Sequence, residues 1–130
     1  MNRYLFLLSI TLLFLIGGCS TYDEKTIEHV LEKEDFTNIE EIVIRDGNTG
    51  DTKTITEETQ IAELLSLINK VVLYKDDNQE PRDGFSYTLT FKEDTKKLSM
   101  SDKMLHDTYY KTQPNLAQII ETFYAQLISE

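Results

Sequence analysis

The chain has 130 residues, of which 23 are acidic and 13 are basic, so its formal net charge at neutral pH is −10. This length suits one domain that buries a core without help from a metal, and the single cysteine excludes a disulfide within the chain. So strong a negative charge disfavours nucleic acid as a partner, and it favours either cationic partners or an acidic surface that serves only solubility.

The N-terminal segment has the order of an export signal. Arg3 supplies a positive charge and residues 5–16 form an apolar run, which is followed by the sequence Ile16-Gly17-Gly18-Cys19. The run is shorter than the roughly 20 residues that a membrane-spanning helix needs. Small side chains before the cysteine let an extended backbone enter a protease cleft, so we expect cleavage rather than a membrane helix.

This segment resembles the lipobox of bacterial lipoproteins, in which an aliphatic residue and two small residues precede an obligatory cysteine. The resemblance implies that Cys19 carries a diacylglyceryl group and becomes the mature N-terminus, with Ile16, Gly17 and Gly18 recognised at the cleavage site. Two acyl chains on one residue give a stable anchor. The expected location is the extracytoplasmic face of the cell membrane, and the composition, rich in Ile, Lys, Glu and Thr, is typical of small Gram-positive lipoproteins.

We therefore expect three segments: a signal peptide at residues 1–18, a segment at 19–37 with the lipidated cysteine, a short tether and a first helix, and a single small α+β domain at 38–130. Removal of the signal also removes Arg3, which leaves 12 basic and 23 acidic residues and a net charge of −11. In the second segment, Thr21 and Glu24 have the spacing of a capping box for a helix that ends near Glu34. Whether that helix lies on the membrane or is itself the tether stays open.

Alternating and helical periods then predict the elements of the domain. Residues 39–45 and 52–55 read as a hairpin around a turn at 46–51, and Thr56 is placed to cap a helix. Its apolar residues recur at helical spacing, at Ile61, Leu64, Leu65 and Ile68.

Further strands are expected at 71–74, 85–91, 97–101 and 104–111, with a polar loop at 75–84 and a last helix after Pro114. The apolar stripe of that helix consists of Leu116, Ile119, Ile120, Phe123 and Leu127. The expected fold is α+β: an antiparallel sheet of about four to five strands with two or three helices packed on it.

One candidate metal site lies at the first turn. Asp46, Asn48 and Glu57 partly resemble the ligand spacing of an EF-hand calcium loop. The sixth position of such a loop needs a glycine, whereas this chain has Asp51 there. The alternative is a plain turn that precedes an acidic helix start.

Two stretches are candidates for partner contact. Asp76, Asp77 and Glu80 form an acidic cluster in the polar loop, and Tyr109 and Tyr110 stand side by side where one ring should face outward. The alternatives are a solvated loop and tyrosines that complete the core.

Catalytic residues are sparse. His29 lies on the first helix, and His106 and Asp107 have Ser99 and Ser101 nearby as nucleophiles, without a strained turn or an oxyanion hole. We therefore expect no enzyme and no cofactor, but a membrane-anchored module that binds a protein or peptide. The alternatives are a lipoprotein that sequesters cationic peptides of the bacteriocin or lysozyme type, and a calcium-dependent binding module.

Overall fold

The computed structural model describes residues 24–82 and 84–129. The expected signal peptide, the lipobox with Cys19, and Thr21 of the expected capping box lie outside the described residues. No helix in the described ranges combines the length and the apolar character needed to cross a membrane.

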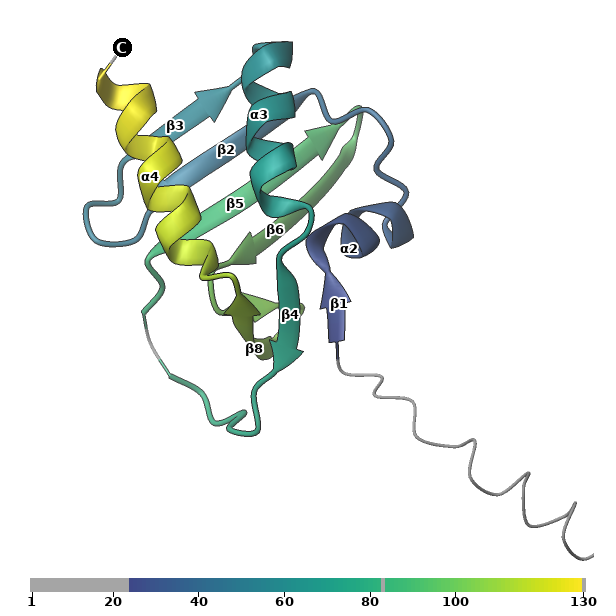
Figure 1. The fold of residues 1–130 in the computed structure, drawn as a ribbon, viewed down its shortest axis with the longest axis vertical. Helices are drawn as coiled ribbons and strands as arrows, with labels where there is room; N and C mark the ends of the chain where they lie inside the picture. The colour runs from purple at the N-terminus through teal and green to yellow at the C-terminus, as the bar shows by residue number, and fades with distance from the viewer. Residues whose placement is uncertain (1–23, 83, 130) are drawn as a thin grey trace, which may run out of the picture.

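The strands form two antiparallel sheets of four (Figure 1). The first sheet has the order β1 (Glu24–Thr26), β4 (Val72–Lys75), β8 (Thr108–Gln113) and β7 (Met104–Leu105). The second has the order β3 (Thr52–Ile55), β2 (Glu41–Asp46), β5 (Tyr87–Glu93) and β6 (Lys96–Ser101). The helices are α2 (Ile27–Lys33), α3 (Glu58–Ile68) and α4 (Leu116–Ser129).

The expected α+β class with antiparallel strands and packed helices is confirmed, and the strands are divided between two sheets. Figure 1 shows α3 and α4 lying across one face of the sheet that contains β2 and β5. The division follows from the short step between β6 and β7, after which β8 pairs with β4 instead of extending the second sheet.

The core of the second sheet follows the alternation of its strands. Ile42 lies opposite Phe91 and Ile44 opposite Leu89, and all four side chains are fully buried. From α3 and α4, the helical stripes supply the covering layer, and their most buried members are Ile61, Leu64, Ile68, Leu116, Ile120 and Phe123. The apolar faces that the sequence predicts for the helices and for the strands therefore pack against each other.

The beginning of the described chain differs from the expected helix. Glu24–Thr26 is a strand, with Glu24 opposite Tyr74, and α2 begins at Ile27 with Thr26 as its N-cap. The Thr26 hydroxyl accepts a hydrogen bond from the His29 N–H at 3.1 Å. Ile27 is fully buried and its N–H donates to the Val71 carbonyl, so α2 packs into the same core as the rest of the domain.

Two further element boundaries differ from those expected from the sequence. The expected strand at 104–111 is two strands, because His106 and Asp107 have φ angles of 48° and 60° and turn the chain back in two residues. The N-cap of α3 is Glu57 rather than Thr56, and no side chain caps that end.

The first hairpin turn is confirmed, and it packs closely on the chain before β5. The Gly47 N–H donates to the Ser86 carbonyl at 2.8 Å. A Cβ at Gly47 would lie 2.1 Å from the Phe85 carbonyl oxygen, so only glycine allows this approach.

Candidate functional site

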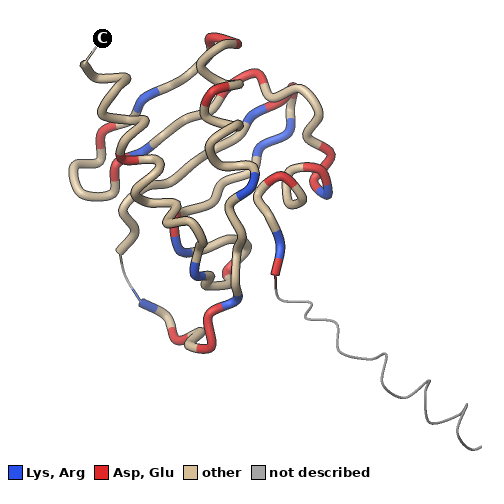
Figure 2. The backbone as a smooth tube through the Cα atoms, in the orientation of Figure 1, with Lys and Arg blue, Asp and Glu red and all other residues tan. Residues whose placement is uncertain are grey.

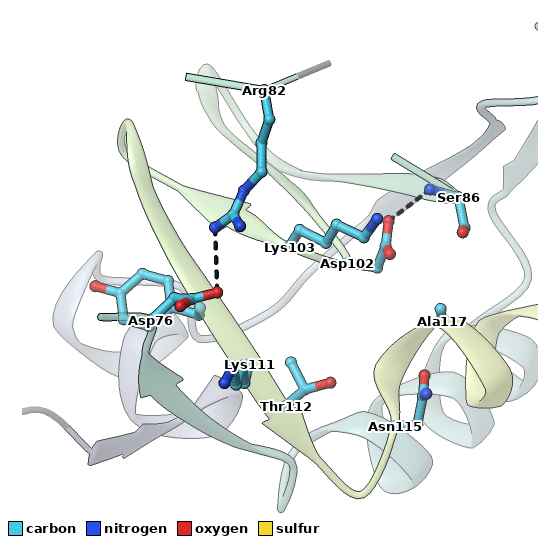
Figure 3. A pocket seen from close by; sticks show the side chains of 10 residues that line it. Asp76, Arg82, Ser86, Asp102, Lys103, Lys111, Thr112, Asn115 and Ala117 are labelled. Atoms are coloured by element: carbon cyan, nitrogen blue, oxygen red, sulfur yellow. Dashed lines mark hydrogen bonds and ion pairs between the residues drawn. The ribbon is translucent and has the colours of Figure 1, made fainter. Parts of the chain in front are cut away.

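A surface cavity of about 490 Å³ lies where the loop after β4, the step between β6 and β7, strand β8 and the start of α4 meet. We call it the charged pocket, and it is lined by Asp76, Arg82, Ser86, Asp102, Lys103, Tyr110, Lys111, Thr112, Asn115 and Ala117. In Figure 3, Arg82 points towards Asp76 and Lys103 reaches across the middle of the view. Lys111 and Thr112 come from β8, and Asn115 and Ala117 come from the chain at α4.

Side-chain hydrogen bonds hold the polar loop against β8, and the side-chain amide of Gln79 pairs with the backbone of Tyr109 as a neighbouring peptide group would. The Gln79 amide nitrogen donates to the Tyr109 carbonyl at 3.0 Å, and the Tyr109 N–H donates to the Gln79 amide oxygen at 2.9 Å. The Tyr109 hydroxyl accepts from the Arg82 N–H and donates to the Arg82 carbonyl, each at 3.0 Å. The loop therefore has a defined shape where it forms the pocket wall.

Asp76 and Arg82 form the charged corner of that wall. An oxygen of Asp76 lies 3.1 Å from the Arg82 guanidinium, which also lies 4.3 Å from the centre of the Tyr109 ring. The Asn78 N–H, and then the Arg82 guanidinium, lower the pKa of the Asp76 carboxyl and outweigh the opposite effect of burial. Asp76 is therefore ionised at neutral pH, and its charge interacts with Arg82 of the loop and, more weakly, with Lys111 of β8.

Asp102 closes the opposite wall. Its side chain is almost fully buried, and one carboxylate oxygen accepts from the N–H groups of Ser86 at 2.8 Å and Tyr87 at 3.1 Å. The Asp102 N–H donates in turn to the Tyr87 carbonyl. This carboxylate fixes the start of β5 on the end of β6.

The two lysines differ from Arg82 because neither forms a direct ion pair, although Lys111 lies near enough to Asp76 to help lower the pKa of that carboxyl. Both side chains are exposed, and within residues 24–82 and 84–129 neither Lys103 nor Lys111 forms an ion pair. The pocket therefore presents two unpaired ammonium groups next to two carboxylates that are already hydrogen-bonded.

The structure brings together some of the residues expected to contact a partner. Asp76 and Tyr109 meet through the Asp76 N–H, which donates to the Tyr109 carbonyl at 2.9 Å. Tyr109 is buried, whereas Tyr110 is half-buried and lines the pocket, with the Lys25 ammonium 5.1 Å from its ring centre. Asp77 and Glu80 are exposed on the same loop but do not line the pocket.

Sequence reasoning missed Arg82, Asp102, Lys103 and Lys111. No spacing relates them, because they come from three separate parts of the chain. The only local signal is Lys111 directly after the tyrosine pair.

The hairpin does not bring the proposed calcium ligands together. An Asp46 carboxylate oxygen accepts from the Asn48 N–H at 2.8 Å, so it closes the turn itself. Glu57 follows Ile55, which pairs with Ile42 at the other end of the hairpin from Asp46. In the part of the chain that the structure describes, no group of three or more His, Cys, Asp or Glu side chains could hold a metal ion.

Ser101 and His106, which were considered for catalysis, have other contacts. The Ser101 hydroxyl oxygen accepts from the Met104 N–H at 2.9 Å, where it shapes the step from β6 to β7. His106 lies 3.1 Å from a carboxylate oxygen of Glu34, at the end of α2.

Comparison of the chain with protein-family models, with curated proteins and with solved structures finds no match.

Proposed function

We propose that this protein is a membrane-anchored extracytoplasmic lipoprotein whose α+β domain binds another protein or a peptide without catalysing a reaction. The observation that supports binding is the loop fixed on β8 by Gln79, Arg82 and Tyr109, which gives the charged pocket a preformed wall. Preformed surfaces lose less conformational entropy when a partner binds. The anchor rests on the resemblance of Ile16-Gly17-Gly18-Cys19 to a lipobox.

Capture of cationic peptides is the second candidate, and the net charge of −10 favours it through electrostatic steering. Figure 2 shows the acidic positions distributed over helices, strands and loops rather than gathered in one patch. Three basic and two acidic side chains line the charged pocket, so this pocket attracts a basic peptide less than the acidic remainder of the surface does.

Affinity purification of the tagged full-length protein from native membranes in mild detergent tests the binding function. We expect a stoichiometric partner that is lost with Lys111→Glu, which reverses a charge in the pocket. The matched control is Lys97→Glu, which reverses an equally exposed charge on β6. Equal recovery of a partner with both variants would show that the partner binds outside the pocket. If the purified protein converted a substrate and His106→Ala abolished that activity, the non-enzymatic role would be contradicted.

Mass spectrometry of the protein isolated from its native membrane tests the anchor separately. We expect an N-terminal peptide that begins at Cys19 and carries the mass of a diacylglyceryl group, and we expect the Cys19→Ala protein to lack it. An unmodified Cys19 in the membrane-bound protein would contradict the anchor and leave the binding result unaffected.

A further inference from the structure

We propose that the charged pocket recognises an acidic peptide segment, whose carboxylate lies among Arg82, Lys103 and Lys111. This inference deepens the binding function proposed above and rests on it for the class of partner. The charges that a ligand would meet are the first argument. Three cations face two carboxylates in the pocket, and among the described residues Lys103 and Lys111 form no direct ion pair, although Lys111 also acts on Asp76 through its charge. Asp76 and Asp102 already accept hydrogen bonds within the fold.

The uncharged polar groups of the pocket also favour an acceptor as ligand. The Thr112 hydroxyl oxygen accepts from the Leu116 N–H at 3.0 Å, and the Asn115 amide oxygen accepts from the Gln118 N–H at 3.1 Å. In each residue the side-chain oxygen therefore already accepts a hydrogen bond from α4, while a donor remains: the hydroxyl hydrogen of Thr112 and the amide NH₂ of Asn115. A carboxylate accepts hydrogen bonds and can use both donors.

These bonds also occupy the backbone N–H groups of Leu116 and Gln118 in the first turn of α4. Fewer backbone donors of α4 are therefore available to a ligand, and the recognition that we propose relies mainly on side chains, the lysines in particular. Lysine ammonium groups are point charges with rotatable donors, so they can adapt to a carboxylate that enters from solvent.

The surroundings of the pocket favour a peptide over a free ion. A cavity of about 490 Å³ is within the range of small-ligand pockets, far larger than one carboxylate needs. The half-buried ring of Tyr110 lines it beside the cations and offers contact area to the residues on either side of an acidic side chain. Figure 2 shows further basic positions around β1 and β4, each with acidic positions beside it, so the attraction for a carboxylate is confined to the pocket itself.

NMR titration of the ¹⁵N-labelled full-length protein in mild detergent tests this inference. The probes are three short capped peptides of the same length, which carry two glutamates, two glutamines or two lysines. We expect saturable shifts of the Lys103, Lys111 and Ala117 amide signals with the glutamate peptide alone, and weaker binding as salt is raised. In the Lys103→Gln, Lys111→Gln double variant we expect affinity to fall about tenfold.

The matched control is Lys53→Gln, Lys97→Gln, which removes two lysines from the second sheet and should leave the affinity within about twofold of the unmodified protein. Equal binding of the glutamine or lysine peptide, or unchanged binding in the double variant with thermal unfolding intact, would overturn the inference. Inorganic phosphate and a soluble short-chain phosphatidylglycerol serve as further probes. Shifts of the pocket signals with either of these, and none with the glutamate peptide, would overturn it in favour of a phosphate ligand.

The two proposals can fail independently. If a partner purifies with the protein but the glutamate peptide does not bind, the binding function stands and the recognition of carboxylates falls. If the peptide binds the pocket but no partner is captured, the recognition of carboxylates by the pocket is supported and the stable complex with a partner is contradicted.

Discussion

At the scale of single residues, Asp102 joins the end of β6 to the start of β5 through hydrogen bonds to backbone groups. The carboxylate accepts from Ser86 and Tyr87, and its own N–H donates to Tyr87. Asp102→Ala would leave these N–H groups without their acceptor, and a buried donor left unpaired costs about 1–3 kcal/mol. We expect the free energy of unfolding, measured with urea, to fall by about that amount.

Asp77→Ala is the matched control for this experiment, because Asp77 is an exposed acidic residue in the loop after β4. Its effect should stay within about 0.5 kcal/mol. An equal loss in both variants would contradict the stabilising role of the Asp102 hydrogen bonds.

At the scale of elements, Glu93 connects the end of β5 to the segment between α2 and β2. One carboxylate oxygen accepts from the Thr37 N–H at 2.9 Å and from the Asn38 N–H, and the other lies 2.8 Å from the Lys96 ammonium. The Lys96 hydrogen bond is the largest influence, and together with the two backbone N–H groups it lowers the pKa of Glu93 against the opposite effect of burial.

The direction of this pKa shift gives a pH dependence. Because the pKa of Glu93 is lower in the folded than in the unfolded state, its stabilisation is complete above the unfolded pKa, at about pH 4.3, and is lost as pH falls through the folded value. We expect Glu93→Gln to lower the urea midpoint at pH 7 and to differ less from the unmodified protein at pH 3. Glu63→Gln, on the exposed face of α3, should show no such convergence, and a constant difference for Glu93→Gln at both pH values would contradict this origin.

The elements also show what the sequence could predict. The helices α3 and α4 and the strand β5 were predicted because their apolar residues repeat at 3.6 or 2 positions, and their burial follows the same repeat. Strand β1 was missed because three residues are too few for a period and its partner, β4, lies far along the chain. The turn at His106 and Asp107 was missed because neither residue is glycine, although both have positive φ.

The same reasoning applies to the candidate site. Asp76, Tyr109 and Tyr110 were found because loops and paired tyrosines are local signals. The cations opposite them depend on the fold, since Lys103 follows β6, Lys111 lies in β8 and Arg82 is held by the ring and hydroxyl of Tyr109. The chemistry of the pocket is therefore a property of the tertiary structure.

At the scale of the whole molecule, both sheets and all three described helices contribute to a single cluster of buried apolar residues. We expect one cooperative unfolding transition, with tyrosine fluorescence and far-ultraviolet circular dichroism giving the same urea midpoint. Ile120→Ala, at a fully buried position of α4, should lower the free energy of unfolding by about 2–5 kcal/mol. Ile128→Ala, on the same helix but 59% exposed, is the control, and separate transitions for the two probes would contradict a shared core.

The order of the strands has a consequence for synthesis. Each long-range ladder joins an early strand to a late one: β1 to β4, β2 to β5, and β4 to β8. A chain that leaves the ribosome N-terminus first cannot complete the first sheet until β8 has emerged, and α4, which covers the second sheet, follows after that. The β2–β3 hairpin can form early, but both sheets can reach their native form only when β8 and α4 are available, so the final step of folding depends on the last elements of the domain.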